Sequence, residues 1–235
     1  MKTTTPQCAL CAIPVEERIC CTKDGRGPAF CPTLNKRAVI DRSLSILNDP
    51  QVREFARLAS VQEAECYAQR DRKPYVVHPV KPRLQEIMEF ARKMGFQRLG
   101  LAFCEGLKEE AAATVHILNN HGFDTASVMC KVGGTPKEVL GIREEEKILI
   151  GEEETMCNPI AQAEVLNDAG TELNILLGLC VGHDSLFIRH ARAYTTVFAV
   201  KDRVLGHNPL ALIYTRNSYY ARFMEKQPQE AGNSG

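Results

Sequence analysis

The chain has 235 residues, of which 44% are hydrophobic and 25% charged, a composition typical of a globular protein. Lys and Arg together number 29, as do Asp and Glu, so no net charge favours a nucleic acid or an anionic membrane as partner. The apolar runs are shorter than the roughly 20 residues of a membrane-spanning helix, and the N-terminal segment lacks the apolar region of a signal peptide. We therefore expect a cytoplasmic protein.

The first 32 residues predict a loop-rich, metal-binding region. They hold five of the ten cysteines and show neither a helical nor a strand period. The spacing C-x2-C-x8-C-C-x9-C-P begins with a common metal-ligand pattern, and loops of this kind need a metal to hold them. Iron–sulfur and four-thiolate zinc both fit. The candidate ligands are Cys8, Cys11 and Cys31, with Cys20 or Cys21 as the fourth.

The rest of the chain predicts a helical segment followed by an α/β domain. The helical segment is predicted over residues 33–78; within it, apolar residues at helical spacing over 33–71 flank an Asn-Asp-Pro turn, which indicates two helices. From 79 to 222 the pattern alternates, and residues 223–235 are expected to be disordered. Strands are predicted over 98–104, 125–130, 147–151, 172–180 and 195–200, and helices over 82–95, 107–122, 158–170 and 183–191. This alternation predicts a three-layer α/β fold, a mostly parallel sheet with helices on both faces.

Four cysteines recur where a predicted strand is followed by a helix. Cys104, Cys130 and Cys180 end strands, and Cys157 precedes the start of a helix. Their intervals of 26, 27 and 23 residues are each close to one β-α unit. Right-handed crossovers place all strand-to-helix loops of a parallel sheet at one edge, where open α/β sheets bind ligands. The sequence therefore predicts that the four thiols converge at that edge, although four unrelated core cysteines are the alternative.

The chemistry of thiols fits such a position. Helix N-termini lower the pKa of a thiol, and the thiolate is the form that binds metal or acts as a nucleophile. Four thiolates commonly hold an iron–sulfur cluster, so we predict a 4Fe-4S cluster at the edge and a second cluster, or zinc, near the N-terminus. His183, close after Cys180, is the candidate proton donor or additional ligand; a solvent-facing helix residue is the alternative. Cys66 is interpreted as a buried core residue.

The segments CALC, FCP, GLAFCEGL, MCNPIAQAEVLN, GLCVGHDSLF and VKDRVLGHNP resemble those of a family of uncharacterised, cysteine-rich proteins, described as metal-binding and found largely in anaerobic bacteria and archaea. The resemblance runs from about Cys8 to about Tyr220, and MCNPIAQAEVLN and GLCVGHDSLF are its specific parts. It implies metal binding but no particular reaction. The ligands that it implies are Cys8, Cys11, Cys31, Cys104, Cys130, Cys157 and Cys180.

Together, the sequence predicts an iron–sulfur protein with redox or sulfur-handling chemistry at the carboxyl edge of a parallel sheet. An iron–sulfur oxidoreductase is the enzyme class that fits, and its partner would be an electron donor or a small-molecule substrate. One alternative is a non-catalytic protein that binds, senses or traffics zinc or another soft metal. Another is a thiol enzyme without metal at the edge.

Overall fold

The computed structural model describes residues 5–225, so the predicted tail lies outside it from residue 226 onward. The described residues form two compact units, which divide between Glu65 and Cys66. The first unit contains two short 3-10 helices and three α-helices. They are η1 (Cys8–Leu10), η2 (Val15–Glu17), α1 (Pro32–Asn35), α2 (Arg37–Ile46) and α3 (Pro50–Glu65).

The predicted Asn-Asp-Pro turn separates α2 from α3. The Asp49 carboxylate accepts hydrogen bonds from the backbone N–H groups of Gln51 (2.8 Å) and Val52 (3.2 Å). These are N–H groups that the first turn of a helix leaves without a partner, so Asp49 caps α3. Pro50 fits the first helical position because it has no N–H to satisfy. The local sequence therefore accounts for this boundary between the two helices.

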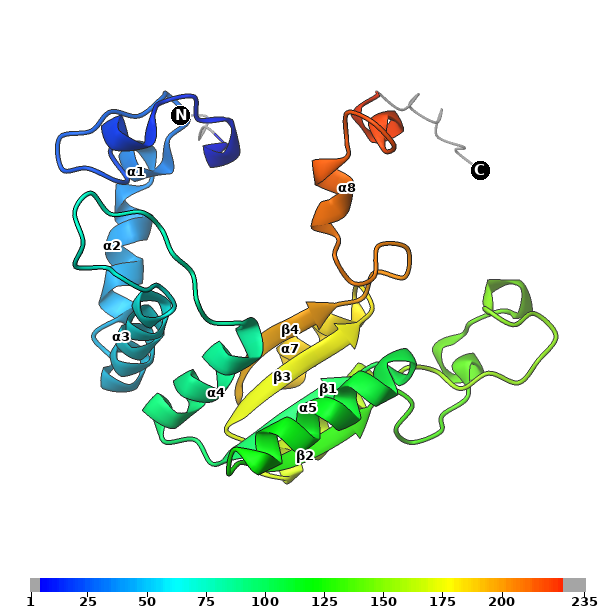
Figure 1. The fold of residues 1–235 in the computed structure, drawn as a ribbon. Coiled ribbons are helices and arrows are strands. Elements are labelled where there is room, and N and C mark those ends of the chain that lie inside the picture. The colour runs from blue at the N-terminus through cyan, green and yellow to red at the C-terminus, as the bar shows by residue number, and fades with distance from the viewer. Residues whose placement is uncertain (1–4, 226–235) are drawn as a thin grey trace. The chain divides into compact units, whose positions relative to one another are not determined.

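The second unit is built on a four-stranded parallel sheet with the strand order β2-β1-β3-β4 (Figure 1). The strands are β1 (Arg98–Phe103), β2 (Asp124–Met129), β3 (Leu173–Leu179) and β4 (Tyr194–Val200). Its longer helices are α4 (Arg83–Met94), α5 (Lys108–Asn120), α6 (Pro159–Asp168) and α7 (His183–His190). Shorter helices are η3 (Glu105–Leu107), η4 (Lys137–Leu140), η5 (Glu144–Glu146), α8 (Leu210–Tyr214) and η6 (Ala221–Met224). The predicted α/β fold is confirmed.

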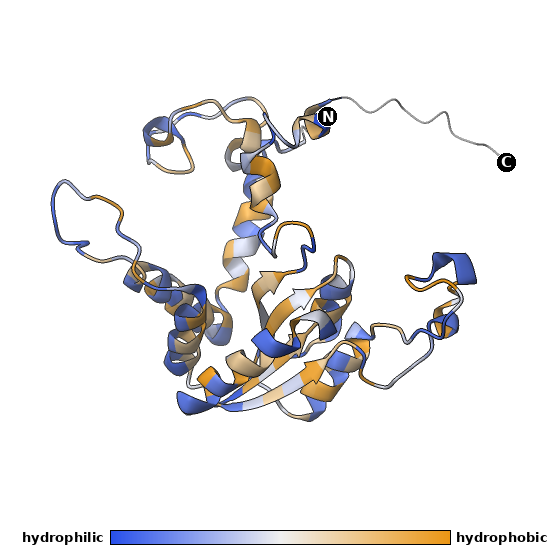
Figure 2. Ribbon diagram, turned by 45° about the vertical axis from the view of Figure 1, so that its right-hand side comes forward, coloured by the Kyte–Doolittle hydropathy of each residue, from blue (hydrophilic) through white to orange (hydrophobic). Residues whose placement is uncertain are grey.

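The sheet is apolar on both faces, and each face packs against helices. On one face, Leu99 and Leu101 of β1 share a core with residues of α4 and α5. On the other face, Ala102 of β1 and Leu176 of β3 share a core with residues of α6 and α7. Every residue of β3 is buried, as expected for a central strand covered on both faces. Figure 2 shows the resulting apolar character of the strands.

The strand order reverses between β1 and β3. From β1 the chain moves to β2 at one side, and it then crosses back to β3 and β4 at the other side. The connections after β1 and β3 therefore leave toward opposite faces of the sheet, α5 toward one core and α7 toward the other. Such a switch point opens a crevice outside the carboxyl ends of the strands, where α/β proteins bind ligands.

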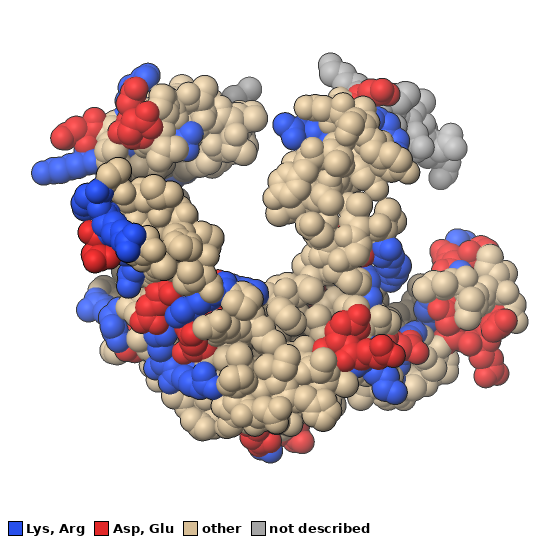
Figure 3. All heavy atoms as spheres, viewed as in Figure 1, with Lys and Arg blue, Asp and Glu red and all other residues tan. Residues whose placement is uncertain are grey.

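The strand predicted over residues 147–151 was wrong. This stretch belongs to a 137–154 segment between β2 and α6 that contains only turns and the 3-10 helices η4 and η5. Its apolar residues are largely exposed, with Ile148 78% exposed. Side-chain carboxylates accept backbone N–H groups that would otherwise pair with a neighbouring strand. For example, the N–H of Ile148 donates to the carboxylate of Glu154 at 3.0 Å. Figure 3 shows acidic side chains gathered on this segment.

Ion pairs give the 137–154 segment its shape. Lys147, whose side chain is 6% exposed, contacts the carboxylates of Glu138 (2.6 Å) and Glu144 (2.8 Å). At the base of the segment, Lys137 contacts Glu154 at 2.8 Å, with both side chains mostly buried. The charged residues around the short apolar run are therefore tied to one another across the segment. In the part of the chain that the structure describes, no helix combines the length and the apolar character needed to cross a bilayer.

Gly178 is expected to be far less tolerant of alanine than Gly95. Both have a positive φ, +66° and +75°, but a Cβ at Gly178 would lie 2.1 Å from Leu107 Cδ1, whereas one at Gly95 meets nothing within 4 Å. Gly95→Ala should lower the free energy of unfolding by about 1–2 kcal/mol through backbone strain alone. Gly178→Ala should cost about 2–4 kcal/mol because overpacking adds to that strain. Urea unfolding of both variants measures the difference, and equal losses would contradict the close packing of Leu107 on β3.

Candidate functional site

The predicted edge cysteines lie at the carboxyl ends of the strands. They are Cys104 after β1, Cys130 after β2, Cys180 after β3, and Cys157, two residues before α6. Cys104 and Cys180 follow the two strands between which the strand order reverses, so they flank the switch point. All ten cysteines of the chain are free thiols. The structure thus brings these four thiols to one edge of the sheet.

Backbone hydrogen bonds hold these cysteines in position. The N–H of Cys104 donates to the carbonyl of Leu177 at 3.1 Å, and that of Cys130 donates to the carbonyl of Phe103 at 2.9 Å. Both bonds extend the pairing of the sheet by one residue. The N–H of Asn158 donates to the carbonyl of Cys130 at 2.7 Å and so holds Cys157 beside the end of β2.

Three of the thiols form a hydrogen-bonded series. The Cys130 thiol hydrogen-bonds to Cys157, and together with the positive charge of Lys131 this lowers the pKa of Cys157 to about 7, although burial acts in the opposite direction. The Cys104 thiol hydrogen-bonds to Cys130, and this bond together with burial raises the pKa of Cys104 to about 12. For Cys130 the bond from Cys104 lowers the pKa, but the bond to Cys157 and burial outweigh it and raise the pKa overall. Cys157 is therefore the first of the three to lose its proton.

Positive side chains lie against the edge sulfurs. Arg203 donates a hydrogen bond to the Cys180 sulfur at 3.1 Å, and Lys201 hydrogen-bonds to the Cys104 sulfur. Lys131 follows Cys130 and acts on Cys157, as described above. Cations near a thiol favour its charged form. These cations therefore favour negative charge at the edge, which in the metal-free protein develops first on Cys157.

Backbone N–H groups add to this environment. The N–H of Glu105 donates to the Cys130 sulfur at 3.3 Å, and the N–H of Gly106 donates to the Cys104 sulfur. Both donors lie in η3, which follows Cys104 directly. Hydrogen bonds to sulfur are among the interactions that tune iron–sulfur ligands. The backbone of η3 thus contributes to the environment of two of the sulfurs.

Lys201 and Arg203 were not predicted as site residues from the sequence. Both lie in a tight loop after β4, in which the Asp202 carboxylate accepts the N–H groups of residues 204 and 205 at 3.0 and 2.8 Å. His207 closes the loop, because its Nδ1 accepts the N–H of Asp202 at 3.1 Å and its own N–H donates back to the Asp202 carbonyl at 2.9 Å. Both residues lie in the segment VKDRVLGHNP, which the family resemblance includes. A lysine and an arginine in a loop are typical of a protein surface, so the sequence does not indicate that the sheet places them beside cysteines.

His183 lies at the first position of α7, after Gly182. It is partly buried. Burial lowers its pKa below the ordinary value, and the charges of Lys131 and Arg203 act in the same direction, whereas Asp184 opposes them. His183 is therefore neutral at pH 7. It can accept or donate a hydrogen bond there through either ring nitrogen.

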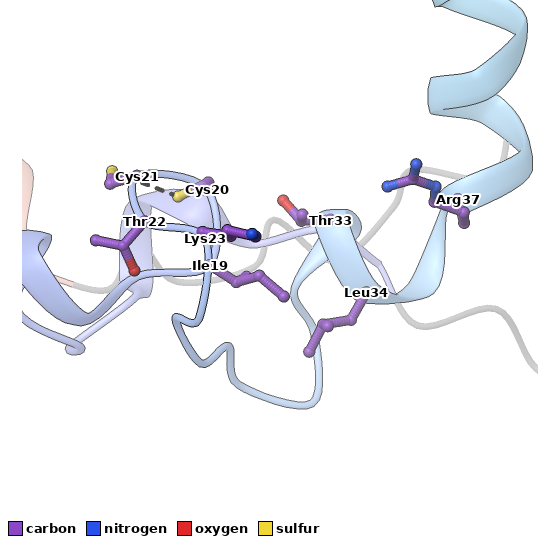
Figure 4. Close-up of a pocket in the computed structure, with 8 residues that line it drawn as sticks. All are labelled: Ile19, Cys20, Cys21, Thr22, Lys23, Thr33, Leu34 and Arg37. Carbon is purple, nitrogen blue, oxygen red and sulfur yellow. Dashed lines mark hydrogen bonds between the residues drawn. The ribbon is translucent and has the colours of Figure 1, made fainter.

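The N-terminal cysteines are less closely grouped. Cys20 and Cys21 lie together, with their sulfurs 3.8 Å apart, and the hydrogen bond with Cys21 is the main reason that the pKa of Cys20 is raised. They line an open cavity of about 530 Å³ (Figure 4). Cys8 and Cys11 lie at η1, where the N–H of Cys11 donates to the carbonyl of Cys8 at 3.1 Å. Both Cys20 and Cys21 are exposed.

Cys31 is the buried member of the N-terminal set and precedes α1. Burial acts against its thiolate, but the backbone N–H groups of Thr33 and Leu34 donate to its sulfur and lower its pKa. Among residues 5–225, no three Cys, His, Asp or Glu side chains are arranged so that they could hold a metal ion. The predicted ligand roles of the N-terminal and edge cysteines therefore stay predictions. Cys66 is buried, as its interpretation as a core residue requires.

Residues 31–198 match the family model described as "Protein of unknown function (DUF1847)". The chain belongs to this family. The matched residues include the four edge cysteines and His183, whereas Cys8, Cys11, Cys20 and Cys21 precede them and Lys201 and Arg203 follow them. The chain is also similar to "Uncharacterized protein MJ0455" of Methanocaldococcus jannaschii. The two are 46% identical over 171 residues, which cover 73% of this chain and 84% of that relative. No solved structure matches the chain.

In the reduced, metal-free protein, iodoacetamide should label Cys157 faster than Cys104. The reason is the difference between their pKa values, about 7 and about 12, because the thiolate is the reactive form. The labelling rate of Cys157 should rise through pH 7, as mass spectrometry of quenched samples can measure. Lys131→Gln should move this rise to higher pH. Similar labelling rates for Cys157 and Cys104 at pH 7.5 would contradict the hydrogen-bonded series of thiols.

Proposed function

We propose that this chain is a metal-thiolate protein that holds an iron–sulfur cluster on Cys104, Cys130, Cys157 and Cys180, for redox or sulfur-handling chemistry at the carboxyl edge of the sheet. The observation that carries the proposal is that three separate loops bring four free thiols to the carboxyl edge of a parallel sheet. A four-thiol donor set is the usual one for such clusters.

The surroundings of the thiols fit a negatively charged group. Lys131, Lys201 and Arg203 act on three different sulfurs of the set. The N–H groups of Glu105 and Gly106 supply uncharged donors. Donors and cations of this kind around thiolates tune the affinity and the potential of a metal centre. Three cations would not stabilise a set of neutral core cysteines that holds no ligand.

Binding requires a rearrangement of the thiols. The thiols of Cys104, Cys130 and Cys157 now form hydrogen bonds from one sulfur to the next, and metal binding removes the protons of these bonds. The sulfurs would then turn from one another toward a shared centre, while the backbone bonds to β1 and β3 keep the loops in place. The bound cluster would supply electron transfer or sulfur chemistry. The cations and N–H donors of the chain would stabilise the negative charge of the cluster. The neutral His183 would offer a hydrogen-bond or proton donor beside the cluster.

Zinc is the alternative occupant, because four thiolates also suit a tetrahedral zinc ion. Protein purified without oxygen should be brown and contain about four iron and four sulfide ions for each cluster. Colourless protein with bound zinc would support the zinc alternative and overturn the cluster. Protein without metal, in which Cys157 alone reacts rapidly, would point to a thiol enzyme.

Serine variants assign the metal to the edge. Cys104→Ser and Cys180→Ser should each lose most of the visible absorption of the edge cluster, because each removes one of its four ligands. Cys66→Ser is the control, since Cys66 is a thiol of the same unit that lies outside the set. Replacing the five cysteines of residues 1–32 by serine should leave the edge cluster in place. Complete loss of metal in that folded variant would contradict an independent edge site.

His183→Ala should change the midpoint potential of the edge cluster while lowering the free energy of unfolding by less than about 1 kcal/mol. The imidazole lies beside the site and is neutral at pH 7, so its loss removes a hydrogen-bonding group near the sulfurs. Redox titration and thermal unfolding give the two values. An unchanged spectrum and potential in His183→Ala would mean that His183 has no role in the site and is only the first residue of α7.

A further inference from the structure

One buried amide lies behind the edge cysteines. Gln162 of α6 is fully buried. Its side-chain Nε2 donates two hydrogen bonds, to the carbonyl of Val128 at 2.7 Å and to the carbonyl of Phe103 at 3.2 Å. Both partners are acceptors, so only the NH₂ group of the amide can face them. The orientation of this side chain is therefore determined by the ends of β1 and β2.

The two carbonyls belong to the strand ends that carry cysteines. Phe103 directly precedes Cys104, and its carbonyl also accepts the N–H of Cys130. Gln162 itself lies in the first turns of α6, and its N–H donates to the carbonyl of Asn158, the residue after Cys157. The side chain and the backbone N–H of Gln162 thus link the three backbone segments from which Cys104, Cys130 and Cys157 extend.

We propose that Gln162 is a positioning residue that sets the separation of Cys104, Cys130 and Cys157. This inference rests on the proposed function, because a ligand set needs a fixed separation of its sulfurs whereas a packed core does not. The Oε1 atom of Gln162 is buried without a hydrogen-bond partner. An unpaired buried acceptor lowers stability, and a hydrocarbon side chain removes that cost but leaves the carbonyls of Val128 and Phe103 without the bond from Nε2. The role of Gln162 is therefore to order the strand ends, and its removal should loosen them more than it unfolds the chain.

Asn174 provides a matched control. It is also a fully buried amide with an unpaired atom, its Nδ2, and its Oδ1 accepts the hydroxyl of Thr171 at 2.8 Å. It lies near the start of β3, about 20 Å along the strand from Cys180 by the rise per residue. Replacing it disturbs the same sheet at the end away from the cysteines.

The experiment compares Gln162→Met with Asn174→Leu in the full-length chain. Co²⁺ serves as the probe in both, because its sulfur-to-cobalt absorption reports the thiolates that bind it. Gln162→Met should bind Co²⁺ at the edge about 10–100-fold more weakly than the wild type, the usual effect of losing a group that orients metal ligands. Asn174→Leu should change the affinity less than about twofold. The cysteines of residues 1–32 are replaced by serine in all three proteins, so that only the edge is titrated.

A second measurement does not depend on metal. Amide hydrogen exchange of the metal-free proteins should be at least about tenfold faster at Cys130 in Gln162→Met, because the bond from its N–H to Phe103 loses its neighbouring support. Asn174→Leu should leave that amide close to wild type. If the wild type binds neither Co²⁺ nor iron, the proposed function fails, and hydrogen exchange alone decides the role of Gln162.

Equal exchange at Cys130 in the two variants would overturn the positioning role, whatever the metal result. Unchanged or equally weakened Co²⁺ binding in the two variants would also overturn it. If Gln162→Met does not fold, Gln162→Asn replaces it, because the shorter amide keeps its donors but cannot reach both carbonyls. The same expected differences from Asn174→Leu then apply.

Discussion

The parallel direction of the strands is the constraint on which the cysteine site depends. Each strand of the sheet ends at the same edge, so every loop that follows a strand opens there. The order β2-β1-β3-β4 places β1 and β3 side by side at the centre, and their following helices lie on opposite faces. Cys104 and Cys180 directly follow these two strands, so they lie at the point where the strand order reverses. A thiol at the other end of a strand could not reach it.

The edge is organised by hydrogen bonds more than by apolar packing. The backbone bonds of Cys104 and Cys130 continue the sheet past the ends of its strands. The thiols then bond to one another, and the sequence of donors leaves Cys157 as the most acidic of the three. Because hydrogen bonds and charges determine this order, it depends on the presence of each partner. A change in one residue there alters the chemistry of its neighbours.

The 137–154 segment lies between two of the cysteines in the sequence, yet its shape is determined separately. Its base is closed by the isolated bridge between Pro136 and Thr155 and by the Lys137–Glu154 ion pair. Closing the base brings Cys130 and Cys157 close although 27 residues separate them. Salt bridges with mostly buried partners hold their geometry better than exposed ones. The two cysteines can therefore meet regardless of what the outer part of the segment does.

The sequence alone determined the elements and the side of the sheet to which the edge cysteines belong. Hydrophobic periodicity fixes helices and strands locally, and the alternation of the two permits only a parallel sheet with right-handed crossovers. The prediction from periodicity was wrong for residues 147–151. Three consecutive apolar residues there resemble a strand, but side-chain carboxylates accept the backbone N–H groups. Only the tertiary structure could bring Lys201, Arg203 and Gln162 to the cysteines, because charges and amides follow no period in a sequence. Their contacts depend on strand order, and strand order is decided by packing between distant parts of the chain.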